Sequence, residues 1–204
     1  MKHIAPICFC LLCTLFSHSQ KLWTESDRKY LLNKLTATRD SLVKETQHLS
    51  EAQWNFKESP TAWSINQVVE HLALWELILQ REISQALLLG PQEDKVIKDV
   101  GKADSLKLAV LMEEKPHITT DYTKPFTFTV PMGTNQGENN IAWFLKMRNE
   151  GINYVDTATS DLRYYFRPGR KDDVHEIFIS VFGHTSRHLR QIRRIKTNPK
   201  YPKV

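Results

Sequence analysis

The chain has 204 residues, and 28 Lys and Arg against 23 Asp and Glu give a formal net charge of +5 at pH 7. This length suits one domain with a core large enough to fold without disulfides or a structural metal. The three cysteines exclude a disulfide-rich scaffold, and the small excess of positive charge does not by itself indicate a nucleic-acid-binding protein.

Residues 1–19, MKHIAPICFCLLCTLFSHS, have the pattern of a secretory signal peptide. One lysine precedes an apolar run over residues 4–16, and small residues precede an expected cleavage site before Gln20. The run is shorter than the roughly 20 apolar residues of a membrane-spanning helix. All three cysteines lie in this leader, so a metal site in the mature chain must use histidines and carboxylates. We therefore expect export to the periplasm or the extracellular space, no stable membrane insertion after cleavage, and one domain over residues 20–204.

Four stretches have the apolar spacing that is typical of amphipathic helices. In chain order they cover about residues 25–48, 65–89, 139–165 and 173–196. The second is the best defined, because Ser64 and Gln67 form a capping box at its start and a Gly-Pro pair stops it.

Residues 91–137, between the second and third stretches, predict two smaller elements. These are a short helix over 103–114 and an extended strand in FTFTVP, residues 126–131. Four long helices with one elaborated crossover, between the second and the third, predict an all-α four-helix bundle.

His184 and His188 lie four residues apart in the sequence GHTSRHLRQIRRIK. At roughly 100° per residue both face the apolar side of their helix, and His71 lies at the margin of the apolar stripe of the second helix. Imidazoles four residues apart project two nitrogens toward one point, as in many metal sites. Two interpretations remain open: core histidines that bind backbone carbonyls, or ligands of a divalent ion to which His71 adds a third nitrogen.

Other polar residues near these histidines are expected to lie at the surface. On the helical wheel Glu70 and Glu76 point away from His71, so we expect them to face solvent, and we expect Arg187 and Arg190 to point outward. The remaining histidines of the mature chain are also interpreted as surface residues: His48, His117 and His175.

Residues 49–76 and 181–195 resemble the two signature regions of the DinB-like (DNA-damage-inducible, YfiT-like) metalloenzyme superfamily. In that family a tryptophan-serine pair opens the second helix and a histidine follows, while the last helix carries two histidines four residues apart and then a glutamine-isoleucine pair. The matching residues here are Trp63, Ser64, His71, His184, His188, Gln191 and Ile192. One departure is that many members have a histidine-proline before the last helix, where this chain has Phe166-Arg167-Pro168.

The resemblance implies a divalent ion, zinc or nickel or another, held by His71, His184 and His188. Three neutral imidazoles leave such an ion an open coordination position, so our first hypothesis is a metal-dependent hydrolase or transferase acting on a small molecule, with its catalytic residues unidentified. A non-catalytic metal- or ligand-binding bundle of the cell envelope is the second hypothesis, and a bundle without metal is the third. From the family we expect a homodimer. We expect no nucleic-acid partner, because no aromatic residues interleave with the basic C-terminal ones.

Overall fold

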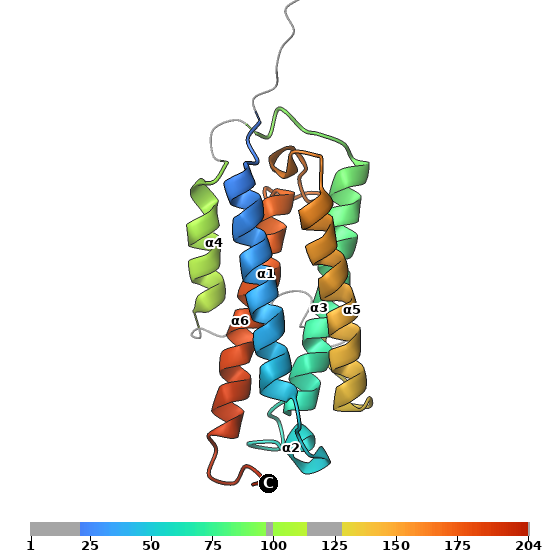
Figure 1. The fold of residues 1–204 in the computed structure, drawn as a ribbon, viewed down its shortest axis with the longest axis vertical. Helices are drawn as coiled ribbons and strands as arrows, with labels where there is room; N and C mark the ends of the chain where they lie inside the picture. The colour runs from blue at the N-terminus through green and yellow to red at the C-terminus, as the bar shows by residue number, and fades with distance from the viewer. Residues whose placement is uncertain (1–20, 97–99, 114–127, 204) are drawn as a thin grey trace, which may run out of the picture.

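The computed structural model describes residues 21–96, 100–113 and 128–203 (Figure 1). The expected all-α bundle is confirmed, because the elements in this part of the chain are helices connected by loops. Four of the helices are long: α1 (Glu25–Thr46), α3 (Ile65–Leu88), α5 (Gly137–Thr157) and α6 (Val174–Lys196). The shorter elements are α2 (Glu51–Asn55), α4 (Lys102–Met112) and the 3-10 helix η2 (Leu162–Tyr164). The proposed leader lies outside the described residues, as does His117.

Local sequence fixes where most of these helices begin. Four of them start with a reciprocal capping box, in which the N-cap side chain accepts from the backbone of the third helical residue, whose side chain accepts from the N-cap backbone. The pairs are Thr24 and Asp27, Ser50 and Gln53, Ser64 and Gln67, and Asp173 and Glu176. Each box satisfies two N–H groups that would otherwise lack partners at a helix start.

The four long helices pack as a square in which each contacts two neighbours. α1 and α3 occupy opposite corners, and both contact α5 and α6. Figure 1 shows α1 and α6 running in one direction and α3 and α5 in the other. Because α3 and α5 are parallel neighbours, the chain must return along the bundle between them, and α4 lies in this crossover, packed against α6.

The apolar core is divided into two clusters along the bundle axis. One contains Leu35, Leu79, Val155 and Phe182, and the other contains Leu42, Leu72, Phe144 and Ile192. A layer of buried polar side chains, one from each long helix, lies between these clusters in sequence: Thr38, Glu76, Arg148 and Thr185. The middle of the bundle is therefore polar, and His184 is adjacent in sequence to a member of this layer.

The third long helix ends eight residues earlier than the periodicity predicts, at Thr157. The Arg28 guanidinium of α1 donates to the backbone carbonyls of Val155, Asp156 and Ala158, at 2.7 Å for Asp156 and 2.6 Å for Ala158. Helix-terminal carbonyls need such partners. The end of α5 is thus set by a side chain more than 120 positions away, which no local pattern reveals.

The prediction of a strand in residues 126–131 is wrong for residues 128–131. Residues 126 and 127 lie outside the described part of the chain, and residues 128–131 form a turn and an irregular segment. A strand needs a partner strand for its backbone hydrogen bonds. The Thr129 carbonyl instead accepts a hydrogen bond from the His71 side chain.

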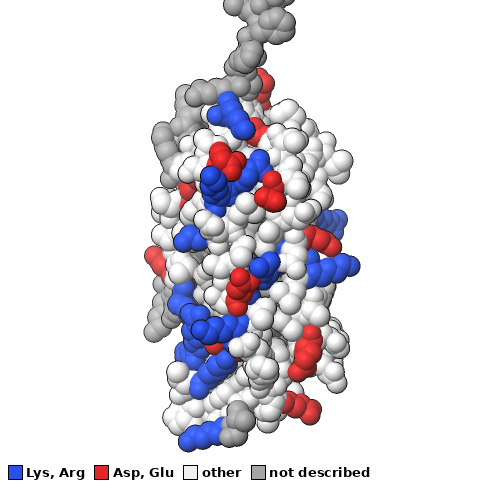
Figure 2. Space-filling view, viewed as in Figure 1, with Lys and Arg blue, Asp and Glu red and all other residues white. Residues whose placement is uncertain are grey.

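Basic residues gather over the end of α6, and several of them pair with acids of other elements. Figure 2 shows Lys and Arg on the lower part of the molecule, where α6 ends in Figure 1. Arg193 and Lys196 both lie beside Glu45, at 2.7 Å and 3.0 Å, and Arg194 lies 3.4 Å from Glu58. None of the described helices combines the length and the apolar character that a membrane span requires.

Candidate metal centre

The structure brings the three predicted histidines to one point. His71 extends from α3, and His184 and His188 extend from adjacent turns of α6. The Nε2 atom of His184 lies 3.2 Å from that of His71 and 3.1 Å from that of His188. One ligand atom from each ring lies within 4.8 Å of the other two. Helices separated by over a hundred positions therefore supply three nitrogens to a common point.

Two of the rings are oriented by hydrogen bonds at their opposite nitrogens. His71 Nδ1 lies 2.6 Å from the Thr129 carbonyl oxygen, and His188 Nδ1 lies 2.8 Å from the side-chain oxygen of Gln191. These oxygens can only accept, so both Nδ1 atoms carry the hydrogen and, in a neutral ring, each Nε2 keeps its lone pair. This arrangement, with a second group fixing the tautomer of a histidine, is characteristic of metal ligands.

Two of the three Nε2–Nε2 separations fit a transition-metal ion. Imidazole nitrogens bound tetrahedrally at about 2.0–2.1 Å to one zinc ion are roughly 3.3–3.4 Å apart. His184 Nε2 lies 3.2 Å from that of His71 and 3.1 Å from that of His188, close to this value. Without an ion, the same geometry requires the His184 ring to donate one Nε2 hydrogen to both neighbours. The three nitrogens therefore suit a divalent ion. The alternative is a hydrogen on His184 Nε2 that is shared between His71 and His188.

Burial keeps two of the rings, those of His71 and His184, neutral. It lowers the pKa of His71 to about 4, and the positive charge of Arg187 acts in the same direction while the hydrogen bond to Thr129 opposes it. Burial also lowers the pKa of His184 well below its ordinary value, and His188 and His71 add to this effect. Neutral imidazoles are the form that binds metal. At neutral pH His71 and His184 thus offer lone pairs without first releasing protons.

Two tryptophans enclose the histidines. The Trp63 ring centroid is 4.9 Å from that of His71, and the Trp75 centroid is 4.9 Å from that of His184. His71 is 1% exposed and His188 is 8% exposed, whereas His184 is half-buried. These indoles limit the access of water. Arg187, expected to point outward, is half-buried.

A buried ion pair lies one helical turn from the site. Arg148 of α5 is fully buried and donates to Glu76 of α3 with two of its nitrogens, from Nε at 3.0 Å. The same guanidinium donates to the Leu35 carbonyl at 3.1 Å and to the hydroxyls of Thr38 and Thr185, both at 2.8 Å. One side chain therefore connects all four long helices beside His184.

The expectation that Glu70 and Glu76 of α3 face solvent is wrong. Glu70 is 6% exposed and Glu76 is 5% exposed, because a loop covers the first and Arg148 pairs with the second. A sequence signal for this pair was present: Arg148 follows Phe144 by four residues and so lies in the apolar stripe of its helix. A cation at such a position indicates a buried anion on a neighbouring helix.

His175 was expected at the surface and is instead 1% exposed, while His48 is exposed as expected. The indole Nε1 of Trp23 donates to His175 Nδ1 at 3.0 Å. His175 precedes His184 by nine residues on α6, and the three-histidine group does not include it. Its position in the first turn of the helix suggested solvent, but the segment that precedes α1 covers it.

Comparisons with known proteins identify a family for this chain. The model of the DinB superfamily matches residues 34–192, which include all three histidines of the cluster. No curated protein and no solved structure matches the chain.

Proposed function

The chain belongs to the DinB superfamily, and we propose that His71, His184 and His188 hold a divalent metal ion, zinc or nickel, for a hydrolase or transferase reaction on a small molecule. The observation that supports this proposal most directly is the convergence of three Nε2 atoms, two of which have their lone pairs freed by hydrogen bonds at Nδ1. When bound, such an ion supplies Lewis acidity that polarises an oxygen or sulfur atom of a substrate.

The residues around the histidines have separable roles in this proposal. Thr129 and Gln191 hold the rings of His71 and His188 in the tautomer that binds metal. Trp63 and Trp75 exclude water from two sides, which strengthens electrostatic interactions at the site. The half-buried His184 belongs to the part of the cluster that is most open to a substrate.

Elemental analysis of protein purified without a histidine tag tests metal binding. We expect about one zinc or nickel ion per chain after exposure to either metal and removal of excess. His184→Ala should lose it, since only two imidazoles would remain. His48→Asn is the matched control, because His48 is exposed and has φ 59°, a backbone conformation that Asn tolerates. Wild-type protein without metal, or H184A with a full ion, would contradict the proposal.

Burial of the cluster supports a second candidate, a closed metal- or ligand-binding bundle without catalysis. His71 and His188 are nearly inaccessible, and a saturated ion needs no path for a substrate. Cobalt(II)-substituted protein distinguishes the candidates, because azide binding to an open position changes the visible absorption spectrum. An azide-dependent change supports the enzyme. A spectrum that azide does not alter supports the closed site.

A third candidate, a bundle that uses no metal, has a thermal test. A ligand that binds only the native state raises its stability. We expect zinc to raise the melting temperature of wild-type protein, EDTA to reverse the rise, and the triple alanine variant of the histidines to lack the response. A wild-type melting temperature that zinc does not change would favour the metal-free bundle.

We also propose that the protein is exported and forms a homodimer, with no nucleic-acid partner. The apolar leader pattern of residues 1–19 supports export. N-terminal sequencing of protein recovered from the periplasm of a Gram-negative host should begin at Gln20. Light scattering after size-exclusion chromatography should give twice the mass of one mature chain. Full-length cytosolic protein would contradict export, and a monomer mass would contradict the dimer.

A further inference from the structure

A segment of the crossover, residues 129–135, lies along the start of α3 beside the histidine cluster; we call it the strap. Three hydrogen bonds connect the strap to α3. His71 Nδ1 lies 2.6 Å from the Thr129 carbonyl, the Gly133 N–H donates to Glu70 Oε2 at 2.7 Å, and Asn66 Nδ2 donates to the Asn135 carbonyl at 2.7 Å. Its first contact orients a candidate ligand, and the other two attach it to the scaffold.

The two attachments share one face of the helix. Asn66 and Glu70 are four residues apart, so their side chains are neighbours one turn from each other. Gly133 has a φ of +70°, and a Cβ there would lie 3.1 Å from Gln67 Cγ. The strap therefore packs closely against the helix at the position where the Glu70 carboxylate accepts its N–H.

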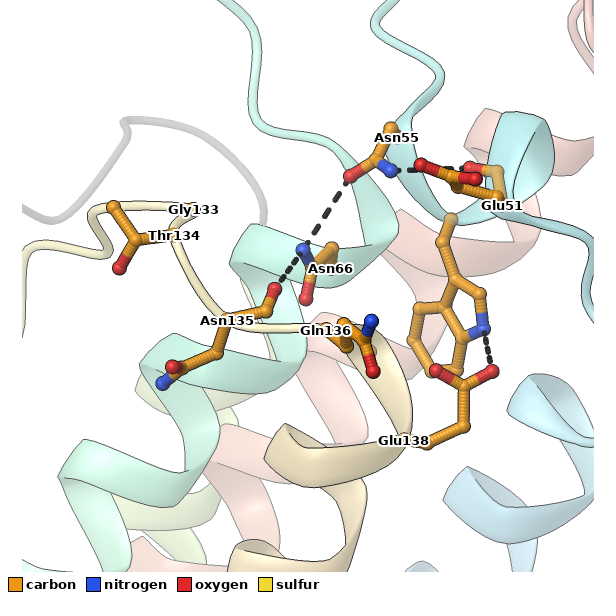
Figure 3. A pocket seen from close by; sticks show the side chains of 10 residues that line it. Glu51, Asn55, Asn66, Gly133, Thr134, Asn135, Gln136 and Glu138 are labelled. Carbon is orange, nitrogen blue, oxygen red and sulfur yellow. Dashed lines mark hydrogen bonds between the residues drawn. The ribbon is translucent and has the colours of Figure 1, made fainter.

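Gly133, Thr134 and Asn135 of the strap line a cleft of about 360 Å³. Figure 3 shows the Asn66 side chain between Asn55 and the Asn135 backbone. The polar groups at this wall already bind one another, since Asn140 also donates to the Asn66 oxygen at 2.8 Å. The Asn66 amide and the Glu70 carboxylate therefore both hold the strap against α3.

We propose that Glu70 is a positioning residue for the metal centre: by accepting the Gly133 N–H it holds the strap so that the Thr129 carbonyl sets the orientation and tautomer of His71. This inference rests on the proposed metal function. Glu70 adjoins His71 in sequence, yet its carboxylate acts through the strap. Its burial, at 6% exposed, is explained by this contact.

Zinc affinity, measured by competition with a chromophoric chelator, tests the role of Glu70. Loss of a group that orients a metal ligand weakens binding by roughly 10- to 100-fold, so we expect about tenfold weaker binding for Glu70→Ala. Glu70→Gln keeps an acceptor oxygen for Gly133 and loses the charge, and it should stay within about threefold of wild type. Glu82→Ala is the matched control: Glu82 lies on the same helix, is 8% exposed and pairs with Arg167 at 3.1 Å, far from the cluster. Its affinity should be unchanged.

The outcomes separate positioning from charge and from folding. Equal losses in E70A and E70Q would show that the negative charge matters and would overturn the proposal, as would wild-type affinity in E70A. If E70A does not fold, Asn66→Ala removes the other attachment of the strap, and wild-type affinity in N66A would then overturn the proposal.

A measurement on zinc-free protein distinguishes failure of this inference from failure of the metal proposal. Long-range ¹H–¹⁵N NMR spectra report which nitrogen of His71 carries the hydrogen. We expect Nδ1–H in wild type, E70Q and E82A, and a mixture of tautomers in E70A. Wild-type protein that binds no zinc would refute the metal function alone. An unchanged tautomer in E70A would refute the role of Glu70, whatever the zinc result.

Discussion

Replacing Arg148 by methionine should be among the most destabilising single changes in the described part of the chain. Met replaces the aliphatic part of the Arg side chain, so the main loss is the guanidinium with its volume and its hydrogen bonds. Those bonds reach Leu35, Thr38, Glu76 and Thr185 on the other three long helices. Of these partners, Glu76 alone carries a charge and thus depends most on Arg148.

The magnitude follows from what each partner retains. The Thr38 hydroxyl still donates to the Lys34 carbonyl at 2.8 Å, and the Thr185 hydroxyl still donates to the Val181 carbonyl at 3.0 Å. Glu76, at 5% exposed, is left without its cation. An ion pair broken in this way costs about 3–5 kcal/mol, against about 5–15 kcal/mol for the whole free energy of unfolding.

Urea unfolding at pH 7 measures this cost, and a double variant identifies its source. R148M should lose about 3–5 kcal/mol, whereas R148M combined with Glu76→Met should recover most of the loss, because no charge remains buried. Arg39→Met is the control: Arg39 is half-buried and its partner Asp40 is exposed, so the change should cost less than about 1 kcal/mol.

The pH dependence has a defined sign. Burial raises the pKa of Glu76, and Arg148 opposes that rise. Removing Arg148 therefore raises this pKa further, and the cost of R148M should shrink as the pH falls and Glu76 takes up a proton. A loss below about 1 kcal/mol, or a double variant less stable than R148M, would refute the reasoning.

Two further changes test other buried contacts. Burial lowers the pKa of His175 to about 4 although Asp104 lies 3.6 Å from its ring, so the unfolded chain takes up a proton below pH 6.5 that the native state refuses. From pH 7 to pH 5 wild type should lose about 2 kcal/mol more stability than His175→Gln, which keeps an acceptor for Trp23, and equal losses in urea unfolding would contradict this. Gly137→Ala should cost about 1–3 kcal/mol in thermal unfolding, because its Cβ would lie 2.2 Å from the Trp54 ring. Gly151→Ala, in the interior of the same helix with its nearest neighbour at 3.6 Å, should instead be neutral or stabilise by up to about 1 kcal/mol, and similar losses in both variants would argue against overpacking at residue 137.

Much of the fold was predictable because its signals are local. The apolar spacing of the four long helices and the capping box at Ser64 depend on neighbours within one or two turns, and they placed the starts of these helices within about two residues. The histidine candidates were local in the same sense. His184 and His188 lie on the side of α6 that faces the bundle core, because their sequence spacing places them on the same face as its buried apolar residues.

Three features that depend on a contact with another element were assigned wrongly. Glu76 was expected in solvent because a helical wheel shows only residues of the same helix, whereas its partner Arg148 lies 72 positions away on another helix. His175 was expected at the surface because Trp23 comes from the far end of the chain. Likewise the end of α5 depends on Arg28 of another helix.

The sequence alone determined a bundle of four amphipathic helices, its DinB resemblance and three imidazoles directed toward its interior, since each depends on residues within a few turns. The tertiary structure decided that His71 meets His184 and His188, that the strap orients His71, and that a charge pair occupies the middle of the core. These contacts join segments 58 to 113 positions apart. A buried polar group or charge is stable only when a partner lies within hydrogen-bonding distance, and it is the packing of the helices that places these partners together.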